Sequence, residues 1–209
     1  MNARETRKKE TIRRILDAAA QAFAAAGFEG ARMDDIANRA GVNKAMIYYH
    51  IGDKRALYTE VLHNIFGDAA ARLTANLEHA ASPNDKIKAY LRSIFETIER
   101  HPHLPPVMMR EMAAGGVNLP EIVAGDLASI IGTIARLLSE GRQCGQFREV
   151  HPFVLHMMVV GGFSFYKTSG PARNRYSELM AHTRRRPGDI ERNDLKNEIE
   201  KIVLNAVSK

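Results

Sequence analysis

The sequence predicts an all-α protein, and three observations carry that prediction. Along most of the 209 residues, apolar side chains recur every three or four positions, which is the spacing that gives a helix one buried face. Glycines, prolines and N-capping residues separate these stretches where helices would begin and end. No stretch alternates apolar and polar residues convincingly enough for a half-buried strand, and the sequence contains no internal repeat.

The first expected helix lies at the N-terminus and is strongly basic. Residues 1–14 contain six Lys or Arg against two Glu, a net charge of +4. The apolar face of this helix is formed by Ile12, Ile15, Leu16, Ala19 and Phe23. The helix is expected to end near Ala26-Gly27. Such a concentration of charge is typical of a phosphate-binding arm, and a solvated helix end is the alternative.

Residues 31–50, ARMDDIANRAGVNKAMIYYH, have the pattern of a helix-turn-helix. Two aspartates fall in the first turn of a short helix, where negative charge is favourable. Gly41 can adopt the left-handed backbone conformation that ends this helix at no steric cost. Asn43 is a good N-cap for a second helix over residues 44–50. The pattern predicts a second helix that can enter the major groove of DNA.

Six further helices are expected after the helix-turn-helix. A long one begins at Lys54, and the next follows a break at residues 82–85 and ends at residues 101–102. A short helix over residues 105–113 comes next. Three more are indicated by apolar faces at Leu127, Ile130, Ile131, Ile134, Leu137 and Leu138, at residues 153–167, and at Leu195, Ile199, Ile202, Val203 and Ala206. The sequence assigns no structure to residues 168–188, a polar and arginine-rich connection.

The N-terminal residues resemble the TetR family of bacterial repressors over roughly residues 8–60. The resemblance is carried by Gly27-Phe28, Asp35-Ile36-Ala37, Ala40-Gly41-Val42-Asn43-Lys44, Ile47-Tyr48-Tyr49-His50, Lys54 and Leu57. The chain departs from the family pattern at Ala31-Arg32, where Thr or Ser is usual, and at Ile51, where Phe is usual. We therefore expect a weaker cap on the first helix of the motif.

The resemblance implies a two-domain organisation. A three-helix helix-turn-helix DNA-binding domain is expected at residues 1–53, with the motif at residues 31–50. A larger helical domain for effector binding and dimerisation is expected at residues 54–209. The family forms its dimer mainly from the last two long helices, and we expect Leu195 and Ile199 to contribute. Gly161-Gly162 could permit close helix approach in that dimer, or could mark a local kink.

The position of the second motif helix indicates which residues contact DNA. Lys44, Ala45 and Tyr49 are candidates for base-edge contact, because Lys can donate to guanine and Ala can touch the thymine methyl group. Phosphate contacts, as at matching positions of the family, are expected from Asn43, Tyr48, His50 and Lys54. Tyr48 could instead be a packing residue. Arg32 is expected to contact the DNA backbone or the minor groove.

Methionine and aromatic residues are frequent in the C-terminal part of the chain. The candidate effector-pocket residues are Phe95, Met108, Met112, Met157, Phe163 and Tyr166. Flexible, polarizable methionines suit a pocket for apolar ligands, which favours a small apolar or amphipathic effector. Ordinary core packing is the alternative for these residues.

Other classes of function find little support in the sequence. No phosphate-binding glycine loop, HExxH motif or nucleophile elbow is present, so neither an enzyme nor a cofactor is expected. The histidines and the single cysteine, Cys144, are too scattered for an expected metal site. One cysteine excludes an internal disulfide and is typical of cytoplasmic proteins. No apolar run approaches the ~20 residues of a membrane span, and the charged N-terminus lacks a signal core.

The sequence therefore predicts a cytoplasmic, homodimeric transcriptional regulator that binds a double-stranded, palindromic operator. By the resemblance it is a repressor released by a small-molecule effector. The alternative is a helical DNA-binding structural or protein-partner module without an effector. Such a module would have a filled core with no pocket of about 300 Å3 or more.

Overall fold

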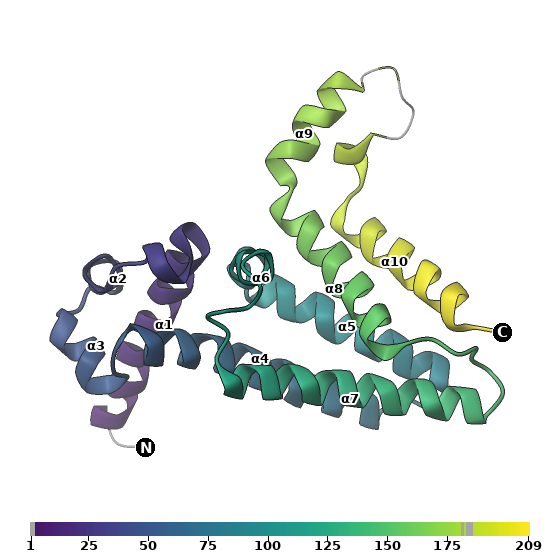
Figure 1. Ribbon diagram of the computed structural model, residues 1–209, viewed down its shortest axis with the longest axis horizontal. Coiled ribbons are helices and arrows are strands. Elements are labelled where there is room, and N and C mark those ends of the chain that lie inside the picture. The colour runs from purple at the N-terminus through teal and green to yellow at the C-terminus, as the bar shows by residue number, and fades with distance from the viewer. Residues whose placement is uncertain (1–2, 181, 183–185) are drawn as a thin grey trace. The chain divides into compact units, whose positions relative to one another are not determined.

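The computed structural model describes residues 3–180, 182 and 186–209. These residues form ten α-helices, one 3-10 turn and an isolated antiparallel bridge between Phe147 and Ser208 (Figure 1). The described residues include no β-strand, which confirms the all-α prediction. The elements are α1 (Ala3–Gly30), α2 (Met33–Ala40), α3 (Lys44–His50), α4 (Lys54–Glu78), α5 (Pro83–Arg100), α6 (Leu104–Ala113), α7 (Glu121–Gln143), α8 (Pro152–Thr168), α9 (Gly170–Leu179), η1 (Pro187–Asp189) and α10 (Arg192–Val207).

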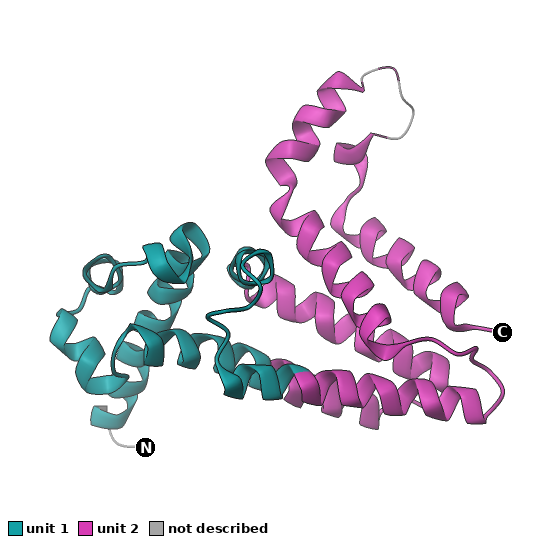
Figure 2. Ribbon diagram, viewed as in Figure 1, with its two compact units in different colours: residues 1–68, 103–127 teal, residues 69–102, 128–209 magenta. Residues whose placement is uncertain are grey.

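The chain forms two compact units, which Figure 2 colours separately. Unit 1 comprises Met1–Asp68 and His103–Leu127, and unit 2 comprises Ala69–Pro102 and Ala128–Lys209. Helices α4 and α7 each contribute residues to both units. The division at residue 53 that the family resemblance implies stays a prediction.

Unit 1 is built around the C-terminal end of α1. Gly27 has a φ of 71°, so the helix is broken where the sequence predicts its end. The ring of Tyr58, on α4, lies 4.8 Å from that of Phe23 and 5.0 Å from that of Phe28 between centroids. These aromatic contacts hold the start of α4 against α1.

Helix α6 is attached to the same part of unit 1 by polar contacts. Arg110 Nη2 donates to the carbonyl oxygen of Ala25 at 3.1 Å. The Tyr58 hydroxyl donates to Oε1 of the buried Glu111 at 2.9 Å. Burial, and next the bond to Glu111, raises the pKa of Tyr58 above its ordinary value. Tyr58 therefore remains a neutral donor to the carboxylate.

Unit 2 packs α5, α8 and α10 together. Ser82 caps α5 by accepting from the backbone N–H of Asp85 at 3.1 Å, which confirms the predicted helix start. The hydroxyl of Tyr90 on α5 forms a hydrogen bond of 3.0 Å with Nδ1 of His156 on α8, and both residues are buried. Glu99 of α5 binds Lys167 of α8 at 3.1 Å and Arg192 of α10 at 2.7 Å. One carboxylate thus joins three helices.

The polar connection after α8 contains structure that the sequence did not predict. Residues 170–179 form α9, which is separated from α8 by Ser169 alone, and residues 187–189 form the turn η1 beside it (Figure 1). None of the described residues of α9 is buried. With no apolar side sequestered, the sequence carries no amphipathic period from which this helix could be recognised.

Helix α7 contains a stretch that is apolar enough for a membrane span, although none was expected from the sequence. A stretch of 18 residues within this 23-residue helix has a mean hydropathy of 1.5, so by length and composition it could cross a membrane. That test is also passed by core helices of soluble proteins. Asp126, near the start of α7, interrupts the apolar sequence and lies 2.7 Å from His63 Nδ1 of α4.

Candidate DNA-binding site and effector pocket

Helices α2 and α3 of unit 1 form the helix-turn-helix that the sequence predicts. Gly41 ends α2 with a φ of 63°, in the left-handed region. The side-chain oxygen of Asn43 accepts from the backbone N–H of Ala45 at 2.9 Å and caps α3. Arg32 stands at the N-cap of α2 without a side-chain capping bond, so the weaker cap is also confirmed. Ile36 and Ile47 are fully buried and hold the helices together.

The rest of α3 points outward. Tyr49 is 81% exposed, Tyr48 is 49% exposed and Met46 is 39% exposed, whereas Ile47 between them is fully buried. Tyr48 is therefore not a core residue. Of the other predicted DNA contacts, Arg32, Asn43 and Ala45 are exposed, and Lys44, His50 and Lys54 are half-buried. Because Ile47 is the one buried residue of the seven-residue α3, most of the surface of this helix is available to a partner.

Besides Asn43, two of the predicted contacts, both lysines, already have protein partners. Lys44 Nζ lies 3.0 Å from Asp34 Oδ1. Lys54 Nζ donates to the carbonyl oxygens of Glu29 at 3.0 Å and Ala31 at 3.2 Å. Lys54 therefore ties the start of α4 to the end of α1, and one of its three donors is left for the predicted phosphate contact. The sequence did not reveal these contacts, because the partners are ten or more positions away along the chain.

Unit 1 has further polar groups in the side chains of His50 on α3 and Arg13 on α1. His50 has a buried Nδ1 that lacks a hydrogen-bond partner within the described part of the chain. On α1, Arg13 binds Glu10 at 2.6 Å and Asp17 at 3.1 Å. The hydrogen bond from Arg13 lowers the pKa of Glu10. The basic N-terminal residues thus belong to a regular helix whose charge is partly neutralised along its own surface.

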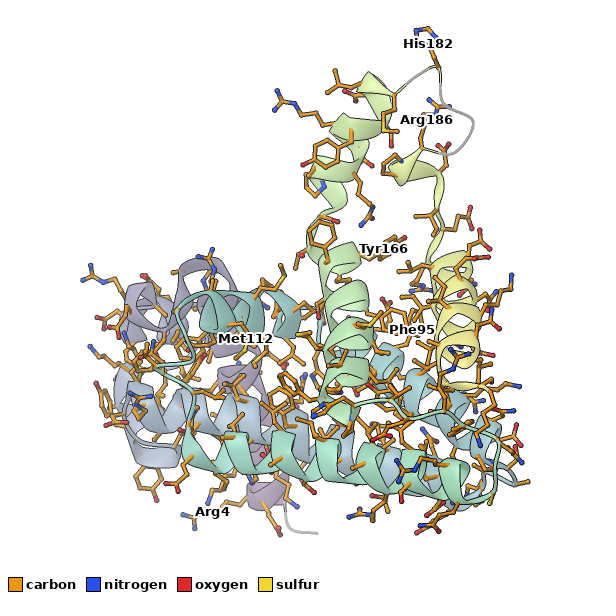
Figure 3. All side chains as sticks on the ribbon, turned by 45° about the vertical axis from the view of Figure 1, so that its right-hand side comes forward. Arg4, Phe95, Met112, Tyr166, His182 and Arg186 are labelled. Atoms are coloured by element: carbon orange, nitrogen blue, oxygen red, sulfur yellow. The ribbon has the colours of Figure 1, made fainter. Side chains whose placement is uncertain are left out.

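Three of the predicted effector residues meet inside unit 2. Phe95, Phe163 and Tyr166 line a small void between α5, α8 and α10, with Glu99, Lys167 and Arg192 at its polar side (Figure 3 labels Phe95 and Tyr166). The rings of Phe95 and Phe163 are 5.4 Å apart. The volume of this void is about 10 Å3. A space of that size holds one water molecule at most.

The other three predicted residues lie elsewhere. Met157, on α8, is 54% exposed. Met108 and Met112, on α6, belong to unit 1, and Met112 is 55% exposed. Unit 2 therefore does not gather the six residues into one cavity. Helical spacing places residues on a face, but it does not say which faces converge.

A larger hollow occurs in unit 2 where no site was predicted. A groove of about 280 Å3 is lined by residues of α4, α5 and α7, namely Thr74, Leu77, Glu78, Lys86, Thr133, Arg136, Leu137 and Glu140. Lys86 and Glu140 form an ion pair across it. Its charged residues have the sequence pattern of solvated helix faces, so a groove was not predictable from the sequence. Among the described residues, no cluster of three or more metal-ligating side chains is present.

A helix-turn-helix with an exposed second helix, carried by an otherwise helical chain, defines the class of DNA-binding regulators. The family model for bacterial regulatory proteins of the tetR family matches residues 15–61, and the model for the tetracyclin repressor-like C-terminal domain matches residues 83–188. The chain belongs to the TetR family and is a transcriptional regulator.

Relatives of known name agree with this assignment. The chain is 33% identical over 157 residues to the HTH-type transcriptional regulator RutR of Escherichia coli, covering 75% of this chain and 74% of that protein. It is 28% identical over 172 residues to the HTH-type transcriptional repressor NicS of Pseudomonas putida, covering 80% and 79%. These relatives are transcription regulators and not enzymes.

Solved structures show the same fold. The transcriptional regulator FadR of Bacillus subtilis, in complex with stearoyl-CoA, superposes with a TM-score of 0.68 at 19% identity, covering 92% of this chain and 97% of that one. The fatty acid degradation regulator FadR of Bacillus halodurans gives a TM-score of 0.68 at 19% identity, covering 92% and 94%. At these identities the likeness concerns the fold alone.

Proposed function

We propose that the protein is a homodimeric repressor that binds a palindromic operator in the cytoplasm and is released from it by a small apolar or amphipathic molecule. The exposed surface of α3 is the observation that carries the proposal. Gly41, Asn43 and the buried Ile47 fix the position of α3. Its outward residues are Ala45, Met46, Tyr48 and Tyr49, a mixed surface in which the two tyrosines supply hydroxyl groups. A rigid, short helix with an open surface is suited to major-groove binding.

The proposed DNA contacts divide into two sets. Lys44, Ala45 and Tyr49 read base edges near the start and along the outer side of α3. The backbone contacts come from Arg32, Asn43, Tyr48, His50 and Lys54. Residues 1–53 act as the DNA-binding domain in this proposal, and residues 54–209 carry effector binding and dimerisation.

Exposed apolar residues on the last helices support the dimer. Phe153, Val154, Met157, Met158 and Phe165 of α8, and Ile202 of α10, are each between 43% and 60% exposed. Leu195 and Ile199 are half-buried, and their contribution to the dimer stays a prediction. Leu195 lines the void of unit 2, and Ile199 Cδ1 lies 3.4 Å from where a Cβ of Gly162 would be, so part of each side chain packs within the chain. The test residues for a dimer are therefore those of the exposed set.

A charge in the exposed α8 surface would test the dimer. Met157→Asp should shift the protein toward a monomer in sedimentation equilibrium, because an isologous interface places the new charge on both sides of the contact. Met112→Asp is the matched control, since Met112 of α6 is as exposed as Met157. Equal oligomeric states for both variants would contradict the proposed interface.

The effector class is supported by the aromatic void and by the relatives. FadR of Bacillus subtilis was solved with stearoyl-CoA, an amphipathic molecule. In unit 2, Phe95, Phe163 and Tyr166 supply an apolar wall. Next to it, Lys167 and Arg192, which share the single carboxylate of Glu99, leave a net positive charge. A ligand of drug-like size requires several hundred Å3, so it must select a conformation in which this void is open. Release from DNA follows if the open conformation binds DNA less tightly.

The small volume of the void favours a second candidate function, a DNA-binding module without an effector. The two are separated by adding apolar and amphipathic molecules, stearoyl-CoA among them, to the protein bound to a labelled duplex from its own promoter region. The repressor proposal expects release by at least one such molecule, and Phe163→Leu should alter the half-maximal concentration. Free coenzyme A is the control for the polar part of the probe. Operator affinity that no molecule changes would support the module.

A further inference from the structure

An ion pair joins the two helices of the DNA-binding motif at its exposed surface. The ammonium of Lys44 lies 3.0 Å from Oδ1 of Asp34 and 3.1 Å from Oδ2. Asp34 is in the first turn of α2, and Lys44 is the first residue of α3. The side chains are 60% and 42% exposed, respectively, so solvent or a bound partner can reach both.

The placement of these charges is unusual for a surface that approaches phosphates. The N-terminus of a helix carries partial positive charge, which disfavours a cation such as Lys44 at that position. Asp34 offsets this by placing both carboxylate oxygens against the ammonium. The consequence is a negative group next to the helix that reads DNA, where phosphate repulsion would lower the affinity for any duplex.

We propose that Asp34 is a positioning residue that determines how Lys44 is used. The carboxylate restrains the ammonium near the start of α3, where base edges are read, and opposes its use as a phosphate contact. Unrelated DNA, which offers phosphates but no matching base edge, is penalised more than the operator. This inference rests on the proposed role of Lys44 in base-edge contact.

Removal of the charge at position 34 tests the proposal. The variant Asp34→Asn frees Lys44 in all complexes. We expect its affinity for a scrambled duplex to rise about 3- to 10-fold, while affinity for the promoter duplex changes by less than about 2-fold. One additional lysine–phosphate contact should steepen the slope of log K against log salt by about 0.9 on the scrambled duplex. Fluorescence anisotropy at several salt concentrations measures both quantities.

A neighbouring residue provides the matched control. Asp35 is also exposed and lies in the same first turn of α2, so Asp35→Asn loses the same unit of charge and the same favourable interaction with the helix N-terminus. It should change both affinities by a similar factor and leave their ratio unchanged. Asp34→Glu, which keeps the carboxylate, should keep the wild-type ratio. Thermal denaturation establishes that each variant is folded.

The double variant of Asp34→Asn with Lys44→Met separates positioning from general repulsion. Without the lysine, the loss of Asp34 should have only the effect of Asp35→Asn on both duplexes. Two results overturn the inference while the proposed function stands. In the first, the ratio of promoter affinity to scrambled-duplex affinity is the same for Asp34→Asn and Asp35→Asn. In the second, Asp34→Asn lowers this ratio and the ratio stays equally low when Lys44 is also replaced. A wild-type protein that binds both duplexes equally overturns the proposed function as well.

Discussion

The DNA-binding motif and the interior of unit 2 differ in how their functional residues are brought together. In the motif, all the candidates except Arg32 are clustered at α3 and its flanking turns, and Ile47 is the one residue of this seven-residue helix that is buried in the core. In unit 2, Phe95, Phe163 and Tyr166 come from α5 and α8 and converge on a void of about 10 Å3. The first arrangement depends on spacing along one helix. The second depends on packing between helices, so it can change when they move.

The largest effect on stability is expected from replacing Ile47, the residue that anchors α3. Ile47 is fully buried, so Ile47→Ala should lower the free energy of unfolding by about 3 kcal/mol through lost burial and a cavity. Met46 is next to it and 39% exposed, and Met46→Ala should change the free energy by about 0.5 kcal/mol or less. Urea denaturation measures both. Equal losses would show that α3 is not held by a single buried contact.

An intermediate effect is expected on the outer side of the same helix. Tyr49 is 81% exposed, so Tyr49→Ala should leave the thermal midpoint nearly unchanged. If Tyr49 contacts bases, its removal should weaken binding to the promoter duplex about tenfold, with a smaller effect on a scrambled duplex. Anisotropy titrations give the two affinities. A folded variant that binds both duplexes like the wild type would remove Tyr49 from the contact set.

The motif was predictable because its signals are local. Gly41 permits a positive φ, Asn43 caps the next helix from two residues away, and Ile47 falls on the inner side of a regular helix. Each signal acts within about one helical turn, so no knowledge of the tertiary structure was needed. The break at Gly27 and the cap at Ser82 were predictable for the same reason.

The remaining features depend on contacts between distant residues. Lys54 binds carbonyl groups more than twenty positions earlier in the chain, and Lys44 binds Asp34 of the preceding helix. Helix α9 lacks a buried face, so the pattern that identifies other helices is missing from it. The effector residues were chosen by type and spacing, and neither property determines which helices meet.

The smallest effect is expected from the pH dependence of the free energy of unfolding, through His156 of unit 2. Burial lowers the pKa of His156, which is bonded to Tyr90. The unfolded chain therefore takes up a proton at a higher pH than the folded chain does. The free energy of unfolding should fall as the pH is lowered from the ordinary histidine value, about 6.5, through the lower folded pKa. Urea denaturation between pH 7.5 and 5.5 measures this loss.

His156→Gln is the comparison for that experiment. It should reduce the pH dependence of stability over this range, whatever its effect on stability at neutral pH. A variant with the same pH dependence as the wild type would show that His156 does not titrate differently in the folded and unfolded chains. The folded His156→Gln variant should bind DNA with the same affinity as the wild type.

Binding of the purified protein to a duplex from its own promoter region, against a scrambled duplex of equal length at two salt concentrations, tests the central claim most directly. If the exposed surface of α3 reads sequence, the promoter duplex should bind at least about 1,000-fold more tightly, and both affinities should fall steeply with salt. Equal affinity for the two duplexes at both salt concentrations would contradict that claim.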